Sequence, residues 1–513
     1  MTHVDDFYRT ATEDGAIWLA PAFAEQRSDA GSLYCRTNSK QKVRARCRSA
    51  APHDGCVQMG PCRWITCALL ASLSAPALAD NYAVIVAGSF GYSNYRHQAD
   101  ACHAYQVLVG RGVPKSHIVT LLYDDLPTIY GNPFPGQLFN KPTLNGTAGR
   151  DVRAGVAVDY RHKDVTTATL LAVLTGNRTA VSGLNGTGRV LESGPQDNVF
   201  VNFVDHGAAG LVEMPVGPPL KKRQLLAALK HMSTKGMFRK LVFYMEACNS
   251  GSMFADLPAD MGVYAATAAN PNEPSWGAYC PPFDFVNGRD FTTCLGDLFS
   301  VNWMEDAERQ AAAAAGGETL EQQFRNVRNA TNRSHVMQYG ELSTGAELVS
   351  NFLGGSPVAA SAALAPPATT ESGAIVSAEQ SAVDVRNIPL VLKFYKYLRA
   401  TGESAARRSA LAHELLAEVR HHERADAVFG ALRASLRDTP VALQAAGASE
   451  DAARAGGDAC FDELLDLARE RCVKLPRWTD YTLKYSSLVS RLCERHGVGV
   501  VRDAIANTCG LWE

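Results

Sequence analysis

Two residues that could carry out nucleophilic and acid–base chemistry end two similar segments of the chain. Residues 199–207 have the sequence VFVNFVDHG, and residues 240–251 have the sequence KLVFYMEACNSG. Each is a run of β-branched, aromatic and other apolar residues that stops at a reactive side chain, His206 in the first and Cys248 in the second. A thiol that attacks a carbonyl and an imidazole that protonates the leaving amine are the pair that cysteine-protease chemistry requires.

Each residue alone has a simpler explanation, because a lone Cys is usually a small buried apolar residue and a lone His a satisfied polar one. The shared layout favours catalysis. Continuous apolar runs predict strands buried on both faces of a parallel sheet, and the carboxyl ends of such strands meet where sites are built. We therefore expect His206 and Cys248 at one edge of the sheet. The backbone N–H groups of Gly207 and Cys248 would form an oxyanion hole there.

The pattern of apolar runs divides the chain into a mainly parallel α/β domain and a helical domain. Strand-like and helix-like segments alternate, which indicates a parallel sheet flanked by helices. The strand-like runs are 82–87, 117–123, 198–204, 240–246 and 262–267, and the helical patterns are 100–110, 166–174 and 223–235. We place this domain at 80–353. Residues 354–389 begin as a stretch rich in Ala, Pro, Ser and Thr, which predicts a linker, and 390–513 show only helical patterns.

A third segment identifies a family. Residues 87–105 have the sequence AGSFGYSNYRHQADACHAY and follow the first strand-like run. This segment resembles the legumains, the asparaginyl endopeptidases or vacuolar processing enzymes among the caspase-like cysteine peptidases. The resemblance runs from about residue 81 to the C-terminus, through YDD at 123–125, SGPQD at 193–197, AANP at 268–271, LGD at 295–297, SVNWMED at 300–306 and SHVMQYG at 334–340.

The resemblance implies a zymogen that cleaves peptides after Asn. It makes 390–513 an inhibitory C-terminal prodomain, removed by self-cleavage at acid pH, where protonated carboxylates weaken its attachment. The expected cleavage sites are Asn387 and Asp384, with Asn351 as another candidate. The expected partners are peptides and proteins with an exposed Asn, together with the chain's own prodomain. Nothing in these motifs calls for a cofactor or a metal ion.

The resemblance also assigns further roles in the site. Asn94 would orient His206, although a turn residue is the competing explanation. An Asn side chain offers one carbonyl acceptor and two N–H donors, so its pocket needs a donor and carboxylates. Arg96, Glu246 and Asp297 supply that set and match the family's specificity residues, with His97 and Ser275 in the same pocket. A protonated Asp resembles Asn, so cleavage after Asp should be confined to acid pH.

Two other classes of function are alternatives to an endopeptidase. Peptide ligation or another transamidation by the same site remains open. Anchor-attaching relatives are a poor match, because they lack the pocket acid Glu246 and normally carry a C-terminal membrane span. An inactive homologue that acts only as a binding module is disfavoured, because Cys248, His206 and Asn94 are all present. A net charge of −2 and the lack of a basic run interleaved with aromatics disfavour nucleic acid as a partner.

The N-terminal part has the pattern of a secretory signal peptide at 59–79. Basic Arg63, the apolar run 64–73 and the small residues at 75–79 occur in the expected order, and the run is too short to span a bilayer. We expect translation to start at Met59, with 1–58 an unstructured or spurious extension. The expected location is the secretory pathway, ending in a vacuole or lysosome or outside the cell.

A secretory route permits disulfides and N-linked glycans. Cys102 is expected to be buried, which leaves six cysteines besides Cys248 after residue 79. The resemblance implies the pairs Cys280–Cys294, Cys460–Cys493 and Cys472–Cys509, a connectivity that spacing alone does not decide. The candidate glycosylation sites are the sequons at Asn145, Asn177, Asn185, Asn329 and Asn332.

Overall fold

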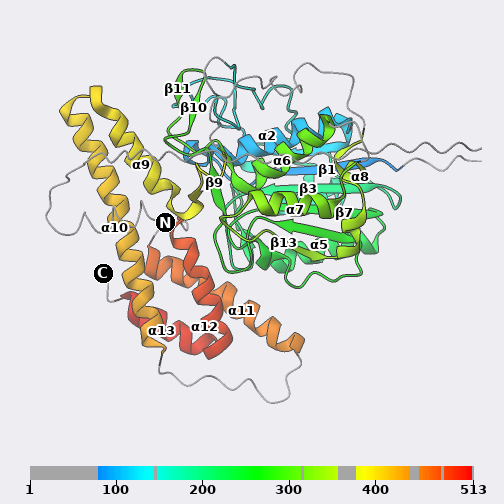
Figure 1. Cartoon of the computed structure of the whole chain (residues 1–513). Helices are drawn as coiled ribbons and strands as arrows, with labels where there is room; N and C mark the ends of the chain where they lie inside the picture. Colours follow the sequence, from blue (N-terminus) through cyan, green and yellow to red (C-terminus); the bar gives the residue numbers. More distant parts are fainter. Residues whose placement is uncertain are drawn as a thin grey trace, which may run out of the picture. The chain divides into compact units, whose positions relative to one another are not determined.

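A six-stranded sheet forms the centre of the N-terminal part of the fold (Figure 1). The computed structural model describes residues 79–143, 147–312, 317–355, 377–437, 450–474 and 479–510. The strand order is β13-β8-β7-β3-β1-β2, and only the edge strand β13 is antiparallel to its neighbour. The strands are β1 (Asn81–Ala87), β2 (Ile118–Leu121), β3 (Asn198–Val204), β7 (Lys240–Glu246), β8 (Val263–Thr267) and β13 (Met337–Gly340). The predicted parallel α/β sheet is therefore confirmed. The strand β13 was not among the strands predicted from the sequence.

Helices cover both faces of this sheet because successive strand residues point to opposite sides. Ala83 and Ile85 of β1 pack with α2, α6 and α7, whereas Val84 and Val86 pack with α3 and α5. The helices of this part are α2 (Tyr95–Gly110), α3 (Thr167–Leu174), α4 (Arg178–Val181), α5 (Lys222–Thr234), α6 (Leu298–Ala312), α7 (Leu320–Ala330) and α8 (Ser350–Leu353).

Helix α2 begins five residues before the predicted start. Its first turn, Tyr95–Gln98, is buried although it includes Arg96 and His97, so apolar periodicity does not reveal it. A single turn of 3-10 helix, η1 (Tyr92–Asn94), leads directly into α2. The first turn of α2 thereby lies within the core instead of on the surface.

Short strands and turns surround the carboxyl end of the sheet. Three small sheets are made of β4 (Gly207–Ala208), β5 (Leu211–Val212) and β6 (Leu220–Lys221), of β9 (Trp276–Ala278), β12 (Gly296–Asp297) and β14 (Val383–Asp384), and of β10 (Phe285–Val286) and β11 (Arg289–Asp290). The 3-10 helices η3 (His162–Asp164) and η4 (Ser250–Met253) lie at this end, whereas η2 (Lys115–His117) precedes β2 and η5 (Leu342–Ala346) follows the antiparallel β13 at the other end. The Cys280–Cys294 disulfide joins the segment after β9 to the one before β12.

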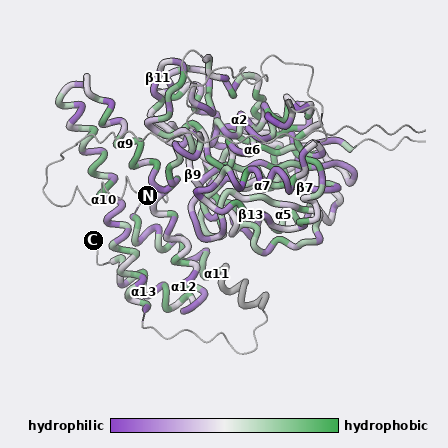
Figure 2. The backbone as a smooth tube through the Cα atoms, in the orientation of Figure 1, coloured by the Kyte–Doolittle hydropathy of each residue, from purple (hydrophilic) through white to green (hydrophobic). Residues whose placement is uncertain are grey.

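The C-terminal part is helical and has its own apolar core. It consists of η6 (Val385–Asn387), α9 (Ile388–Arg399), η7 (Ala400–Gly402), α10 (Ala405–Ser435), α11 (Glu450–Ala468), the π-helix η8 (Arg469–Val473), η9 (Thr482–Tyr485), α12 (Ser486–His496) and α13 (Val498–Gly510). Polar and apolar stretches alternate along α10 in Figure 2, as one buried helix face requires. The core includes the Cys460–Cys493 and Cys472–Cys509 disulfides, whose pairing is the expected one.

Among the described residues, no helix is long and apolar enough to cross a membrane. The predicted signal peptide at 59–79 and the extension 1–58 lie outside the residues described, apart from Ala79. Cys102 is free and buried on α2, as expected.

The helical core should depend on its disulfides independently of the sheet. Replacing Cys472 and Cys509 together by Ala should lower the unfolding free energy of this part by about 3–4 kcal/mol, because the bond closes a long loop. Urea unfolding followed by circular dichroism measures the change. Cys102→Ala, which alters only the core around the sheet, should leave the helical transition in place. An unchanged helical transition in the double variant would contradict the prediction.

Candidate active site

His206 and Cys248 lie two residues beyond the paired ends of neighbouring strands. β3 and β7 are parallel and in register, with Val204 opposite Glu246. Gly207 packs directly against the second strand end: a Cβ atom on it would lie 2.3 Å from the Cys248 carbonyl oxygen and 2.9 Å from the Ala247 Cβ. Only glycine permits this approach. The sheet therefore brings the two residues to one edge, as the sequence predicted.

The contacts of His206 determine which of its ring nitrogens is free. Its Nε2 lies 2.9 Å from Asn94 Oδ1 and 3.3 Å from Asp480 Oδ1. The Asp480 carboxylate accepts hydrogen bonds, and the Asn94 amide donates through Nδ2 to the Phe90 carbonyl, so both oxygens accept. Nε2 therefore carries the proton, and Nδ1 is the nitrogen available for proton transfer.

Burial sets the charge state of His206. It lowers the pKa of His206 to about 4, and although the Asp480 carboxylate acts in the opposite direction it does not outweigh burial. The contact with Asp480, although short enough for an ion pair, therefore joins a neutral imidazole to a carboxylate at neutral pH.

The Cys248 thiol lies beside Ser275. The Ser275 N–H points at Sγ from 3.4 Å, and the Ser275 hydroxyl lies 3.7 Å from Sγ. Burial raises the pKa of the Cys248 thiol, an effect that Arg386 opposes and Asp384 reinforces. The thiol is therefore neutral in this state and has to lose its proton as it attacks.

Arg96, Asp297 and Glu246 form a buried polar cluster behind the two catalytic candidates. Arg96 Nε donates to Asp297 Oδ1 at 2.9 Å, and Glu246 Oε2 accepts from the Ser300 N–H and hydroxyl at 2.8 and 3.0 Å. Three atoms of the cluster are buried without a hydrogen-bond partner: Arg96 Nη2, Glu246 Oε1 and Asp297 Oδ2. Burial, followed by the charge of Asp297, holds the pKa of Glu246 well above its usual range.

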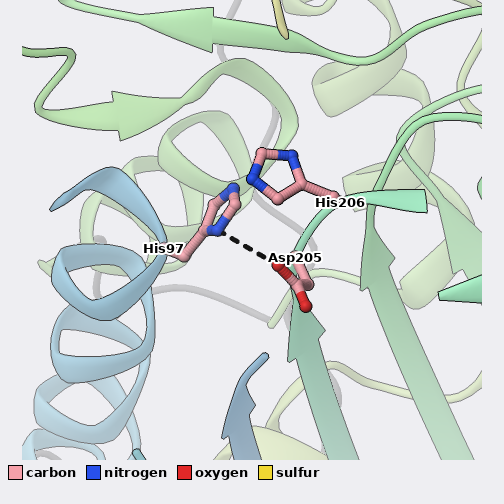
Figure 3. Close-up of side chains that lie close together, drawn as sticks. All are labelled: His97, Asp205 and His206. Atoms are coloured by element: carbon pink, nitrogen blue, oxygen red, sulfur yellow. Dashed lines mark ion pairs between the residues drawn. The ribbon is translucent and has the colours of Figure 1, made fainter. Parts of the chain in front are cut away.

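His97 and Asp205 complete the environment of the catalytic His. Figure 3 shows Asp205 directed at the His97 ring and the His206 ring beside it. His97 Nδ1 lies 2.6 Å from Ser89 Oγ and 3.4 Å from Asp205 Oδ1, and Nε2 lies 3.7 Å from Asp297 Oδ2. Burial lowers the pKa of His97 and raises that of Asp205, so it favours the neutral form of both, and their 3.4 Å contact is an ion pair only when His97 is protonated and Asp205 is ionised.

The same three side chains are close enough to offer ligands to a metal ion. His97, Asp205 and His206 each provide one ligand atom, all within 4.8 Å of one another. A cation bound there would take a nitrogen from His206. Such a cation would therefore compete with proton transfer at His206, and no step derived below uses one.

Residues of the C-terminal part lie across the catalytic pair. β14 pairs antiparallel with β9, with Asp384 opposite Trp276, and the Val385 N–H donates to the Ser275 carbonyl at 3.2 Å. Val385, Ile388 and Leu392 pack against Cys248 and the Cys280–Cys294 disulfide. Arg386 donates to Asn249 Oδ1 at 2.9 Å. The segment around the catalytic thiol is thus covered by the chain itself.

Further contacts join the two parts around this edge. Asp462 bridges Lys221 and Arg223, each at 2.5–2.6 Å, and Arg399 pairs with Asp284 at 2.6 Å. Leu465 and Leu483 pack on Ala208 and Leu211 of the small β4–β5 sheet. Ser486 Oγ accepts a hydrogen bond from the Ala209 N–H at 3.3 Å.

Most residues predicted for the site lie together. Of the predicted cleavage positions, two lie beside the site and one lies far from it. Asp384 is in β14 and Asn387 immediately precedes α9, both beside the site. Asn351 is in α8, and its carbonyl accepts from Asn198 at the opposite end of β3. The sequon residues Asn177, Asn185, Asn329 and Asn332 are exposed, and Asn145 lies outside the described residues.

Sequence reasoning missed the groups that meet this site from the C-terminal part. Asp480, Arg386 and Asp462 come from positions without any distinguishing motif. Asp100, which lies one helical turn after Arg96 and contacts Asp297, did have a signal, because residues four apart share a helix face.

A buried thiol and a buried imidazole at the carboxyl edge of a parallel sheet are the groups that a cysteine peptidase requires. Residues 81–355 match the model of the peptidase C13 family. The chain is 38% identical to legumain of Rattus norvegicus over 434 residues, covering 84% of this chain and 92% of that protein. It is 38% identical to legumain of Homo sapiens, covering 81% and 89%, and 36% identical to vacuolar-processing enzyme beta-isozyme 1 of Oryza sativa subsp. japonica, covering 84% of each.

The chain belongs to the peptidase C13 family, and it is an asparaginyl cysteine endopeptidase of the legumain type. The recognition made from the sequence motifs is confirmed. Among solved structures, caspase-1 from Spodoptera frugiperda aligns with 55% of this chain and 92% of its own at 10% identity and a TM-score of 0.30.

Gly207→Ala should separate the two strand ends. The added methyl group would overlap the Cys248 carbonyl, so Cys248 should be displaced by a few tenths of an ångström or more, and peptide cleavage should fall about 100-fold. Initial rates on an Asn peptide, normalised to folded protein, measure the effect. Gly430→Ala, whose added Cβ would meet nothing within 4 Å, is the matched control and should keep full activity. Equal rates for both variants would disprove the close-packing argument.

Proposed function

We propose that Cys248 is the nucleophile and His206 the general acid and base of this endopeptidase. Cys248 Sγ adds to the scissile carbonyl carbon while its proton passes to His206 Nδ1, and the same nitrogen then protonates the leaving amine. Water hydrolyses the resulting thioester, with His206 accepting its proton. Asn94 orients the ring through Nε2, and the N–H groups of Gly207 and Cys248 stabilise the oxyanion.

The observation that carries the substrate assignment is the set of unpartnered atoms behind the catalytic pair. Arg96 Nη2 is a free donor, and Glu246 Oε1 and Asp297 Oδ2 are free acceptors when unprotonated. A carboxamide needs one donor for its carbonyl and two acceptors for its NH₂ group, so the Asn side chain satisfies all three. An ionised Asp would bring a third carboxylate to this cluster, so cleavage after Asp is expected only at acid pH, where the substrate Asp is protonated. Ser275 and His97 border the same cluster.

The C-terminal residues support a latent form. The strand β14 occupies the edge of β9 beside Cys248, where a substrate strand would add, and Asp480 holds the His206 Nε2–H. We infer that the helical part, 390–513, acts as an inhibitory prodomain, and that Asn387 or Asp384 is cleaved when acid pH loosens it. Asn351 is a weaker candidate because it lies in α8.

The name of the rice relative supports a vacuolar location, and the three disulfides suit the secretory pathway, which leads to a vacuole, a lysosome or the outside of the cell. The exposed sequons suit the same route. Peptide ligation by the same acyl-enzyme is the second candidate function, and the assay below separates it from hydrolysis.

Cleavage after Asn should appear when the chain, expressed from residue 80, is incubated at pH 4–5. Matched peptides with Asn, Asp, Gln or Ala before the scissile bond, analysed by mass spectrometry, measure specificity, and an added amine peptide reports ligation. Cys248→Ala should be inactive. Arg96→Ala should lower kcat/KM for the Asn peptide at least about 100-fold, because a charged hydrogen bond is lost in a buried site. Cleavage of the Ala peptide at the rate of the Asn peptide would overturn the substrate assignment.

Acid should weaken the closed form through His206. Its pKa falls from 6.5 to about 4 on burial, so the closed state binds fewer protons than a solvated His. This contribution to stability is complete above pH 6.5 and is lost as the pH falls toward 4, by up to about 3 kcal/mol. In a Cys248→Ala background, which prevents self-cleavage, the further change His206→Gln should flatten the unfolding free energy between pH 6.5 and 4. Parallel pH curves for the two proteins would contradict this prediction.

A further inference from the structure

A polar stripe runs along one face of helix α2 and leads away from the proposed Asn pocket, in which it begins. Arg96, Asp100 and His103 follow one another at intervals of four and three residues, so they share a helix face. All three are buried, next to the apolar side chains by which the helix packs in the core. Arg96 belongs to the proposed Asn pocket. Asp100 and His103 have no part in the chemistry described above.

Asp100 holds the backbone of the pocket. Its Oδ2 accepts the Asp297 N–H at 3.1 Å, and its Oδ1 accepts from Asn140 Nδ2 at 2.7 Å. Arg96 Nε donates to Asp297 Oδ1. Two residues one turn apart on the same helix therefore contact Asp297, Asp100 at its main chain and Arg96 at its side chain. Asp297 Oδ2 is the oxygen left without a partner.

The hydrogen bonds of Asn140 determine how its side-chain amide is oriented toward Asp100. Its Nδ2 also donates to the Leu295 carbonyl at 2.9 Å, so its two amide hydrogens are both used and its Oδ1 faces His103 Nδ1 at 2.8 Å. His103 Nε2 lies 3.1 Å from Glu308, which Arg150 also contacts. A Cβ on Gly296 would lie 2.8 Å from Asn140 Nδ2 and 3.0 Å from Asp100 Oδ1, so Gly296 is needed for this close packing.

The charges around Asp100 favour its protonated form. Its neighbours include two further buried carboxyl groups, Asp297 and Glu246, and one guanidinium, Arg96. Burial, reinforced by Asp297, holds the pKa of Asp100 well above its usual range, and burial also raises the pKa of Asp297, an effect that Arg96 opposes. A neutral Asp100 contributes hydrogen bonds to the pocket without adding a negative charge next to Asp297.

We propose that Asp100, oriented by Asn140, is a positioning residue that sets the specificity of the pocket for Asn. It places Asp297 so that Oδ2 faces the side-chain amide of the substrate, and it reaches Asp297 without touching the substrate itself. This inference rests on the proposed function, because it assumes that Asp297 reads the Asn side chain.

Asp100→Asn tests this role with almost no change in shape. An amide has one acceptor oxygen, so its NH₂ group must face either the Asp297 N–H or the Asn140 NH₂. The full chain is first activated at acid pH, and KM and kcat on Asn and Asp peptides between pH 4 and 7 then measure the result. We expect KM for the Asn peptide to rise about tenfold or more with kcat changed far less, and the Asn-over-Asp preference to fall. The double variant Asp100→Asn, Asn140→Asp restores an acceptor opposite the new amide and should recover part of the loss.

Cys102→Ala controls for general damage to α2, because Cys102 lies in the apolar core two residues from Asp100, and it should leave KM and preference unchanged. Unaltered KM and preference in Asp100→Asn would overturn the proposal. If Asp100→Asn does not fold, Asn140→Ser is measured in the same way, and the same unaltered values there would overturn it. If Arg96→Ala also leaves Asn cleavage intact, the proposed function itself has failed, which is a different outcome.

Discussion

The parallel pairing of β3 with β7 is the constraint on which the site depends. Seven consecutive residue pairs, from Asn198 opposite Lys240 to Val204 opposite Glu246, fix the two strand ends at the same height. A shift of one residue would turn every side chain to the other face. The close contact between Gly207 and the Cys248 carbonyl then fixes the distance between the two segments that follow these strands. The catalytic geometry is therefore a property of the sheet, and the loops add the pocket and its cover.

The pocket illustrates how a buried cluster of like charges can be tolerated. Three carboxyl groups surround one guanidinium, an arrangement that would be costly if all were ionised. Burial raises the pKa of Asp100 and Glu246, so protonation relieves the repulsion, while Asp297 keeps its direct contact with Arg96. The atoms left unpartnered are those that a carboxamide would satisfy. Specificity and the cost of burial are thus two consequences of the same arrangement.

The sequence predicted the strand-borne residues and missed those that depend on tertiary contact. The runs at 198–204 and 240–246 coincide with β3 and β7, because strands buried on both faces are continuously apolar. The resemblance supplied Asn94 and the three disulfide pairs, which spacing alone did not decide. Asp480 and Arg386 were missed because their partners, His206 and Asn249, are 274 and 137 positions away in the sequence. The first turn of α2 was missed because polar residues line a buried helix start, where binary patterning predicts surface.

A fall in pH has opposite effects on the stability that comes from burying His206 and on the stability that comes from burying the nearby carboxyl groups. His206 has a lowered pKa in the closed form, so stability that depends on its burial is lost as the pH falls from 6.5 toward 4. Asp100, Glu246 and Asp205 have raised pKa values, so stability that depends on their burial is present at low pH and is lost as the pH rises through those values. The two signs follow from one cause, since burial favours the neutral form of every group. A drop in pH therefore destabilises the buried state of His206, although Asp480 attracts its charged form, while it consolidates the buried carboxyl groups. Low pH therefore acts against the burial of His206 and in favour of the buried carboxyl groups of Asp100 and Glu246.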